Sequence, residues 1–547
     1  MHLTTALVVS GGGLQGAAII KSLRAVGGVR VLLADCHDEN VGRFDADGYL
    51  VAPLLSDEPA FAAFLHRVCR EESVDHLFPI TDLELDIFSR EKPALQAAGT
   101  RVWVCSPAIL AVARNKLSLA QWLLTKGLPT LPTAATPAGV GHEGPLLGKP
   151  LAGYGSKGIV KVASLAAALA LPEQQREGLA WQVQLPSFDE YSVDLAISGP
   201  GQISPTYLRR RLRTSGGFAV LCEPSDEPRV SGLAQRTAMA LSEDGALGVL
   251  NLQILVAGDV MVVSDLNARA GMSLPLTLAA GGNPLALLLG APCGQQVSGH
   301  SVRTVRTLSE RLFQRPALHD VRGVVFDLDD TLLDQKDWIQ RKLRLLWQVE
   351  QHWLPPEQDF LRLTLAILEE GERAKLFDVY ARQEGLSEAQ RLTLISSYRM
   401  AQPSAARLYP DVAGALLQLR RRGLRLGLLT DNPAASQRSK LKASGLETAL
   451  DAVVLTGDLG SPKPAPAAFA AAARSLGLAP AQLVMVGDHL FRDSLGALNA
   501  GYQHAFHLQR AGAFFNFDLQ LCGTHLPAGR MTALVGLPEL DWYLRET

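Results

Sequence analysis

A series of short apolar runs in the second half of the chain, each ending at polar residues, constrains the fold most. The runs are GVVF, LRLGLLT and LVMVG, and aliphatic and β-branched runs of this length predict strands. A further motif, SPKPAPAAF, places a lysine before a predicted helix. The polar residues of the series, in chain order, are Asp327, Asp329, Thr331, Thr430, Lys463, Asp488 and Asp493.

In this order the residues resemble the motifs of the haloacid dehalogenase superfamily, over residues 321 to about 510. Between the first two motifs, residues 336–405 contain amphipathic stretches such as WIQRKLRLLWQVEQHW, which predict helices. The resemblance therefore implies a Rossmann-like α/β hydrolase core over 321–335 and 406–547, with a helical cap over 336–405.

The resemblance also implies a role for each motif residue. Asp327 would attack phosphorus and form an aspartyl phosphate, while Asp329 would protonate the leaving oxygen and then activate water. Thr430 and Lys463 would hold the phosphoryl oxygens. An acid at Asp329 favours phosphatase over dehalogenase chemistry, because an alkoxide leaving group needs a proton and a halide does not.

A site for Mg²⁺ or Mn²⁺ is implied by the same motifs. Its ligands would be Asp327, Asp488 and the backbone carbonyl of Asp329, since Mg²⁺ prefers oxygen ligands. Asp493 is expected to support the site by orienting Lys463 or the metal shell. The alternative is that these acids merely cap strand ends.

The N-terminal region begins with a different pattern, a βαβ unit. TALVVS and VRVLLAD predict strands, and the glycine-rich stretch between them leads into an amphipathic helix. Gly11, Gly13 and Gly16 fit G-x-G-x-x-G, and Asp35 stands where a dinucleotide site would hold a ribose hydroxyl. The alternative is that a tight strand-to-helix turn needs small residues whether or not a pyrophosphate is bound.

The order of the motifs that follow decides between these interpretations. Lys116 opens a helix that ends in Gly-Leu-Pro, Lys149 precedes a Gly/Ser-rich loop over 153–158, and GVLNLQILV and VMVVSDLNARAGMS come later. This succession resembles the ATP-grasp superfamily, in the branch of the carbamoyl phosphate synthase large subunit and amino-acid ligases. It implies that the opening βαβ unit is a Rossmann-shaped pre-ATP-grasp domain that binds no NAD.

The ATP-grasp resemblance implies which residues bind ATP. Two lysines would contact its phosphates, the Gly/Ser-rich loop would close over the triphosphate, a linker strand would meet the adenine, and an acid would hold the ribose. The predicted contacts are Lys116, Lys149, Ser156, Lys157, Gln184, Leu185 and Glu190.

Gln253, Asp265 and Asn267 would bind Mg²⁺ shared with those phosphates. Arg269 lies on the same strand face as Asn267, where it would stabilise charge on the transferring phosphoryl group. Two departures from the family pattern are Asp265, where Glu is common, and Gln253, where many members have a second Glu. The alternative for Asp265 and Asn267 is that they cap a turn.

Candidates for substrate contacts are fewer. Arg209 and Arg211, in YLRRRLRTSGG, would bind a substrate carboxylate or the acyl phosphate, or else belong to a solvated charge run. Glu84 follows a predicted strand end, where open α/β sheets place ligands, and is a candidate for the substrate amine.

Composition indicates which partners to expect. The 547 residues carry 52 Lys plus Arg and 54 Asp plus Glu, a formal net charge of −2. Nucleic acid and membrane surfaces are therefore not expected as partners. The absence of a long apolar run or a signal-like start predicts a cytoplasmic protein, and six scattered cysteines predict reduced thiols. Expected partners are small carboxylates, amines and phosphomonoesters, with a homodimer left open.

Together these patterns predict an α/β multidomain, bifunctional enzyme. An ATP-dependent carboxylate-amine ligase would span the pre-ATP-grasp domain, 1–110, and the ATP-grasp domain, 111–298. A linker lacking strand character, 299–320, would join it to a Mg²⁺-dependent phosphomonoester hydrolase. The fusion suggests that both halves act in one small-molecule pathway. The alternative is a phosphatase regulated by a nucleotide-binding half that does not ligate.

Overall fold

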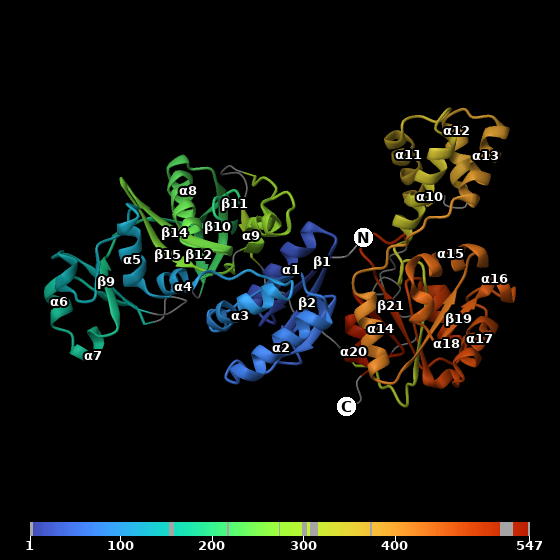
Figure 1. Ribbon diagram of the computed structural model, residues 1–547, viewed down its shortest axis with the longest axis horizontal. Helices are drawn as coiled ribbons and strands as arrows, with labels where there is room; N and C mark the ends of the chain where they lie inside the picture. The colour runs from blue at the N-terminus through green and yellow to red at the C-terminus, as the bar shows by residue number, and fades with distance from the viewer. Residues whose placement is uncertain are drawn as a thin grey trace. The chain divides into compact units, whose positions relative to one another are not determined.

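A computed structural model describes residues 4–151, 158–215, 218–272, 274–297, 303–306, 315–371, 375–514 and 529–544 of the chain. The chain divides into two compact units, Met1–Arg311 and Leu312–Thr547. The first runs from blue to yellow-green in Figure 1 and the second from yellow to red. The division falls inside the predicted linker, residues 299–320, and each unit is described by itself.

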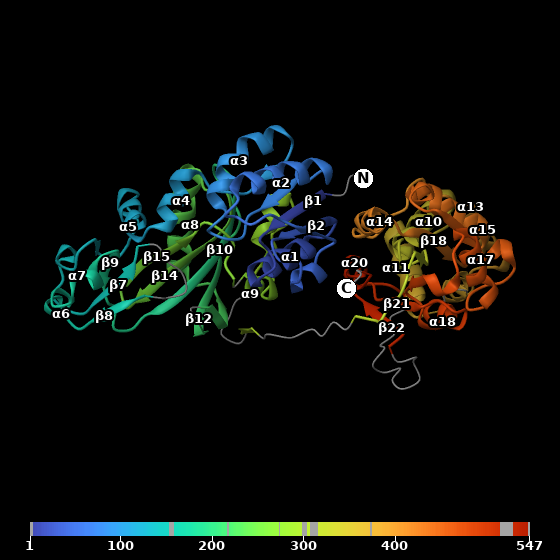
Figure 2. The ribbon, with the colours of Figure 1, turned by 90° about the horizontal axis from the view of Figure 1, so that it is seen from below.

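Parallel strands build the first sheet, in the order β3-β2-β1-β4-β5. Its elements are β1 Thr4–Val9, α1 Leu14–Val26, β2 Val29–Asp35, β3 Gly48–Val51, α2 Glu58–Glu71, β4 His76–Phe78, α3 Leu85–Ala97 and β5 Arg101–Val102. Helices α2 and α3 lie on one face of this sheet and α1 on the other (Figure 2). Leu7 and Leu32 pack in the cluster formed with α2 and α3, whereas Val8 and Leu33 pack with α1. Because both faces are covered, the middle of each long strand is apolar, as in other parallel sheets.

Packing explains the glycine turn after β1. A Cβ atom on Gly16 would lie 1.8 Å from the carbonyl oxygen of Gly11, so a side chain there would collide with the turn. The N–H of Gly12 donates to Oδ2 of Asp35 at 2.8 Å, and the N–H of His37 donates to Oδ1 at 3.1 Å. The turn itself thus accounts for Gly16 and for both oxygens of the acid in the dinucleotide-like pattern.

Two antiparallel sheets follow in the same unit. A four-stranded sheet has the order β6-β9-β7-β8, and a seven-stranded sheet has the order β15-β14-β10-β12-β13-β16 with β11 beside β10. The strands are β6 Thr133–Ala134, β7 Leu146–Pro150, β8 Val160–Val162, β9 Leu179–Val183, β10 Asp189–Gly199, β11 Gln202–Ile203, β12 Tyr207–Ser215, β13 Phe218–Ser225, β14 Gly248–Ala257, β15 Val260–Asn267 and β16 Thr304–Val305. Helices α4 Pro107–Arg114 and α5 Lys116–Thr125 precede the four-stranded sheet, and α8 Pro228–Glu243 lies between β13 and β14. The predicted α/β multidomain fold class, with a Rossmann-like parallel sheet at its start, is confirmed.

Strand β16 corrects one detail of the prediction. Its residues fall within 299–320, which was expected to lack strand character, yet they pair with Leu221 and Cys222 of β13. The side chain of Thr304 is buried there. A two-residue edge strand gives no periodicity in the sequence, so only the neighbouring strand reveals it.

The second unit contains a six-stranded parallel sheet in the order β19-β18-β17-β20-β21-β22. Its strands are β17 Gly323–Phe326, β18 Arg425–Thr430, β19 Ala452–Leu455, β20 Leu483–Gly487, β21 His504–Leu508 and β22 Met531–Leu534. Helices α14 Val412–Arg421, α15 Ala434–Ser444, α17 Pro466–Leu476 and α20 Pro538–Tyr543 pack around it. The central strand β17 is fully buried, and Leu540 of α20 completes the same core.

Four helices, inserted after β17, form the predicted cap. They are α10 Gln335–Glu350, α11 Glu357–Glu369, α12 Leu376–Gln383 and α13 Glu388–Met400, and Figure 1 shows them gathered at one end of the sheet. The cap has its own apolar cluster, which includes Leu343, Phe360 and Tyr380. In the described part of the chain, no helix is both long enough and apolar enough to cross a membrane.

Candidate functional site

Three strand ends meet at one edge of the six-stranded sheet. Asp327 directly follows β17, Thr430 ends β18, and Asp488 directly follows β20. Because β17 pairs in parallel with both β18 and β20, the three residues adjoin. All three are buried, although polar residues are usually exposed. Strand alternation and parallel pairing together therefore place these polar side chains at one site.

Lys463 lies between two of the acids. Its Nζ donates to Oδ1 of Asp327 at 2.6 Å and to Oδ1 of Asp493 at 2.5 Å, and its side chain is 3% exposed. Burial opposes the charge on Lys463, but the carboxylates of Asp327, Asp493 and Asp431 outweigh it and raise the pKa of the lysine. Lys463 is therefore a fixed cation beside Asp327, and Asp493 orients it as predicted from the sequence.

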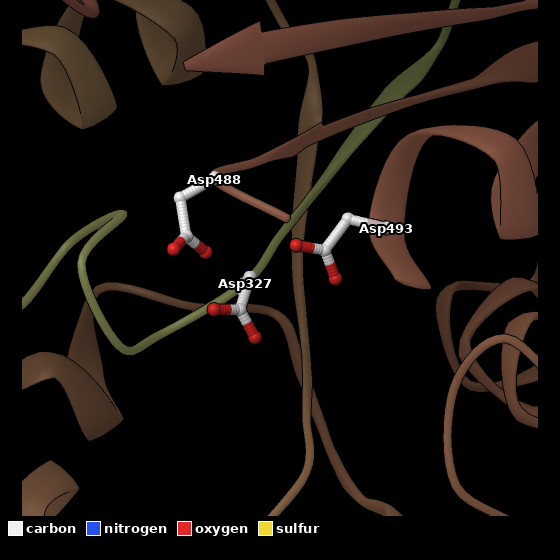
Figure 3. Close-up of side chains that lie close together, drawn as sticks. All are labelled: Asp327, Asp488 and Asp493. Carbon is white, nitrogen blue, oxygen red and sulfur yellow. The ribbon is translucent and has the colours of Figure 1, made fainter. Parts of the chain in front are cut away.

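Asp327, Asp488 and Asp493 form a three-acid cluster. Each offers one carboxylate oxygen, and these oxygens lie within 4.8 Å of one another (Figure 3). Burial, followed by repulsion from neighbouring carboxylates, raises the pKa of both Asp327 and Asp488. The cluster carries a buried excess of negative charge, and its carboxylate oxygens are hard donors. Such a donor set fits a divalent cation such as Mg²⁺.

The carboxylate of Asp329 lies outside the three-acid cluster. Its Oδ1 accepts from Nζ of Lys440 at 2.5 Å, and its Oδ2 accepts from Asn432 and Gln437, each at 3.0 Å. The third acidic side chain of the cluster is thus Asp493, which was expected only to support the site. The predicted role of the backbone carbonyl of Asp329 as a metal ligand stays a prediction.

In the first unit, four of the predicted ATP-site residues converge. Lys116, at the start of α5, forms an ion pair with Asp265 of β15. Lys149 of β7 is partly buried, and burial lowers its pKa; Lys116 acts in the same direction, while Asp265 and Glu190 oppose it. Residues far apart in the sequence, on two sheets and one helix, therefore share one electrostatic environment.

The predicted metal ligands of that unit share one strand pair. Gln253 of β14 lies directly opposite Asp265 of β15, and Asn267 follows at i+2 on the same face. Arg269 donates through Nε and Nη2 to Oδ2 of Asp82, at 2.9 and 2.7 Å. Its side chain is therefore held by the loop after β4, and its role at a phosphoryl group stays a prediction.

The remaining predicted ATP contacts lie between and beyond the sheets. Gln184 and Leu185 connect β9 to β10, and Leu185 packs against Leu131 and Leu255. Ser156 and Lys157 lie outside the described residues.

Arg209 is not available to a substrate, which corrects the prediction for it. Its side chain is 0% exposed and forms an ion pair of 2.6 Å with Asp194, which is equally buried. Strand alternation places Arg211 on the same face of β12, where it pairs with Glu190, the predicted ribose acid. Of the two arginines, only Arg211 thus stays a substrate candidate.

Glu84 is likewise buried and structural. Its carboxylate is 0% exposed and accepts from Oγ of Ser10 at 2.5 Å, from the N–H of Thr81 at 2.9 Å and from the N–H of Ile80. Burial raises the pKa of Glu84 to about 7. The acid ties the ends of β1 and β4 together, so the prediction that it binds a substrate amine is wrong.

Comparison with known proteins identifies the second unit. Residues 321–501 match the family model of haloacid dehalogenase-like hydrolases. Over 189 residues the chain is 32% identical to glyceraldehyde 3-phosphate phosphatase of Methanopyrus kandleri, a match that covers 33% of this chain and 81% of that protein. The chain belongs to the haloacid dehalogenase-like hydrolases.

The N-terminal part of this hydrolase matches a second model. Residues 7–103 fit the PylC-like N-terminal domain. The chain also aligns with a crystal structure of N5-carboxyaminoimidazole ribonucleotide synthetase from Thermus thermophilus, with a TM-score of 0.42 and 20% identity, over 53% of this chain and 79% of that one. For the HAD phosphatase from Thermococcus onnurineus the TM-score is 0.28 at 25% identity, over 41% of this chain and 98% of that one.

Two residues of the hydrolase site escape a search by motif. Nε2 of Gln437 donates both to Oδ2 of Asp329 at 3.0 Å and to Oγ1 of Thr430 at 2.7 Å. Lys440, three residues further along α15, donates to the other oxygen of Asp329. Their i, i+3 spacing on the helix after Thr430 is a signal in the sequence, because such residues share one helix face.

A cavity of about 960 Å³ lies between the hydrolase core and its cap. The motif residues line its floor. The cap contributes one stripe of α10 at i, i+3, i+4 and i+7, consisting of Gln335, Trp338, Ile339 and Lys342. Cavities of this size, with a few placed polar groups, suit small molecules.

Proposed function

We propose that the second unit is a Mg²⁺-dependent phosphomonoesterase that works through an aspartyl phosphate. The observation that carries the proposal is the position of Asp327, buried against Lys463 and within the three-acid cluster. A carboxylate in that place is a nucleophile with a cation beside it, and a phosphoryl group next to it would meet Thr430 as a hydrogen-bond partner. The phosphatases that the chain resembles support this chemistry.

The proposed reaction has two steps. An oxygen of Asp327 bonds to phosphorus as the ester P–O bond breaks, and Asp329 gives its proton to the departing alkoxide. Water then attacks phosphorus and gives a proton to Asp329, and the bond from phosphorus to Asp327 breaks to release inorganic phosphate. Lys463 faces the phosphoryl oxygens throughout, while Lys440 and Gln437 hold Asp329 in place.

Mg²⁺ would be held by the three-acid cluster, where it would neutralise charge on Asp327 and the phosphoryl group. The cluster therefore combines the nucleophile with two further acids, so that Asp327 would both help to hold Mg²⁺ and attack phosphorus.

The test is hydrolysis of p-nitrophenyl phosphate with and without MgCl₂. We expect Mg²⁺-dependent turnover by the wild type and its loss in Asp327→Asn, which keeps the shape but removes the nucleophile. Asp359→Asn, on the exposed surface of α11, is the matched control and should keep wild-type activity. Turnover by Asp327→Asn equal to the wild type would exclude the proposed nucleophile.

For the first unit we propose an ATP-dependent carboxylate-amine ligase that forms an acyl phosphate. The support is the convergence of Lys116, Lys149, Glu190 and Asp265, two cations and two acids suited to a nucleotide with its Mg²⁺. ADP release should depend on a carboxylate and an amine together and be lost in Lys149→Ala. Lys161→Ala, an exposed lysine on β8, is the control. ATP binding without acceptor-dependent ADP release would instead support a regulatory nucleotide site.

A further inference from the structure

A buried lysine in the cap lines the hydrolase cavity without a counter-charge. Lys342 of α10 is 9% exposed, although lysine is almost never buried unless paired. Its Nζ lies 4.2 Å from the centre of the Tyr398 ring, on α13, a cation-π contact. Among the described residues, no carboxylate lies within ion-pair distance of it.

Among the described residues, none of the acids that line the cavity pairs with Lys342. Those outside the three-acid cluster each pair with another cation: Asp329 with Lys440, Asp378 with Arg391, and Asp431 with Arg492. Within the cluster, Asp327 and Asp493 pair with Lys463. Lys342 is thus a cation that the described residues leave without an anion.

Such a side chain is unfavourable in the free protein. An ammonium removed from water needs a partner of opposite charge, and an aromatic ring supplies only part of that stabilisation. Burial, followed by the nearby charge of Lys440, lowers the pKa of Lys342 to about 8. An anionic group brought by a ligand would remove the imbalance.

The position of Lys342 indicates which part of the ligand carries this anionic group. α10 begins at Gln335, directly after the loop that carries Asp327 and Asp329, and Lys342 lies two turns along its cavity-facing stripe. Lys440, which donates to the proposed general acid, is close enough to influence the charge of Lys342. Lys342 therefore lies on the side of Asp329, where the alcohol leaves, and Trp338 and Ile339 lie between it and Gln335 on the stripe.

We propose that Lys342 binds a second anionic group, a carboxylate or a second phosphate, on the leaving alcohol of the substrate. The substrate class is then an acidic organic phosphate with a short apolar spacer between its two charged ends. This inference rests on the proposed phosphatase activity and deepens it. An acid of this kind also matches the carboxylate that the first unit is proposed to activate.

The test compares matched substrates on the intact chain. Phosphooxyacetate, 3-phosphooxypropanoate and 4-phosphooxybutanoate are each paired with their primary amide, which keeps the shape and removes the charge. Propane-1,3-diyl bisphosphate provides the second-phosphate arm. At the best length we expect kcat/KM to favour an anionic substrate over the amide by about tenfold or more, as one buried charge-assisted contact supplies.

Variants at Lys342 identify the residue responsible. Lys342→Met should reduce the acid-to-amide ratio to about one, whereas Lys342→Arg should retain a preference for the acid. Lys336→Met, on the same helix but outside the cavity lining, is the matched control and should keep the wild-type ratio. A preference for the bisphosphate over every carboxylate would identify a second phosphate as the anion.

Two results would overturn the inference while leaving the phosphatase in place. One is wild-type hydrolysis of p-nitrophenyl phosphate with equal kcat/KM on acids, amides and the bisphosphate. The other is an unchanged acid-to-amide ratio in Lys342→Met, with all substrates slowed alike, which is the effect of a structural residue. Wild-type protein that does not hydrolyse p-nitrophenyl phosphate at all would instead refute the proposed function itself.

Discussion

The ammonium nitrogen of Lys440 lies 2.5 Å from Oδ1 of Asp329, and the two side chains are only 5% and 10% exposed. A helix that follows β18 thus holds an acid that follows β17, and the contact is shielded from solvent. Together with Gln437, Lys440 positions Asp329 opposite the proposed nucleophile.

Replacing Lys440 with Met should impair proton transfer more than binding. We expect kcat to fall about 10-fold to 100-fold on an alkyl phosphate and less on p-nitrophenyl phosphate, because general acid catalysis matters most for a poor leaving group. Lys442→Met, exposed on the same helix, is the control. Equal losses on both substrates would contradict a role in holding the acid.

Mg²⁺ should stabilise the second unit against heat. An ion that binds only the folded state raises Tm by an amount that grows with the logarithm of its free concentration above Kd, and EDTA should reverse the shift. Asp488→Asn removes one acid of the cluster, so we expect the Mg²⁺-dependent shift in Tm to vanish. Without Mg²⁺ the variant should be no less stable than the wild type near pH 7.5, since burial and neighbouring acids raise the pKa of Asp488. A full Mg²⁺ shift in the variant would exclude this site.

Arg209→Met should destabilise the first unit strongly. The substitution leaves Asp194 as a buried charge without its cation, a change that costs about 3–5 kcal/mol of unfolding free energy. Urea unfolding, followed by amide hydrogen exchange in β10 and β12, measures the effect. Arg213→Met, exposed on the same strand, should change stability by less than about 0.5 kcal/mol. Comparable losses for the two variants would show that the buried pair is unimportant.

Glu84 should make the stability of the first unit depend on pH. Its pKa is raised from 4.5 to about 7, so the folded state binds a proton that the unfolded state has lost. The stability that this proton contributes is present below pH 4.5 and is lost as the pH rises towards 7. Glu84→Gln mimics the protonated acid and should flatten the decline, which amounts to about 3 kcal/mol. Hydrogen exchange of β1 and β4 amides between pH 5 and 8 measures it, and parallel profiles would contradict the prediction.

The sequence by itself determined the strands, the order of their polar ends and the helical cap. Aliphatic runs that end at turn residues specify strands locally. Because the strands are parallel, the polar residue at the carboxyl end of each one lies at the same edge of the sheet. Asp327, Thr430 and Asp488 meet for this reason alone. The convergence of Lys116, Lys149 and Asp265 follows equally from motif order, because the ATP-grasp resemblance carries its spatial arrangement.

Only the tertiary structure decided which charged side chains are buried together. Arg209 and Arg211 are two residues apart on one strand face. Arg209 is fully buried in an ion pair with Asp194 of the neighbouring strand, whereas Arg211 pairs with Glu190. Lys342 and Lys440 lie far apart in the sequence and share the cavity because the cap folds over the core. Hydrophobic pattern and secondary-structure propensity depend on residues that are close in the sequence. The desolvation and ion pairing of a charged side chain depend on residues from distant segments that pack around it.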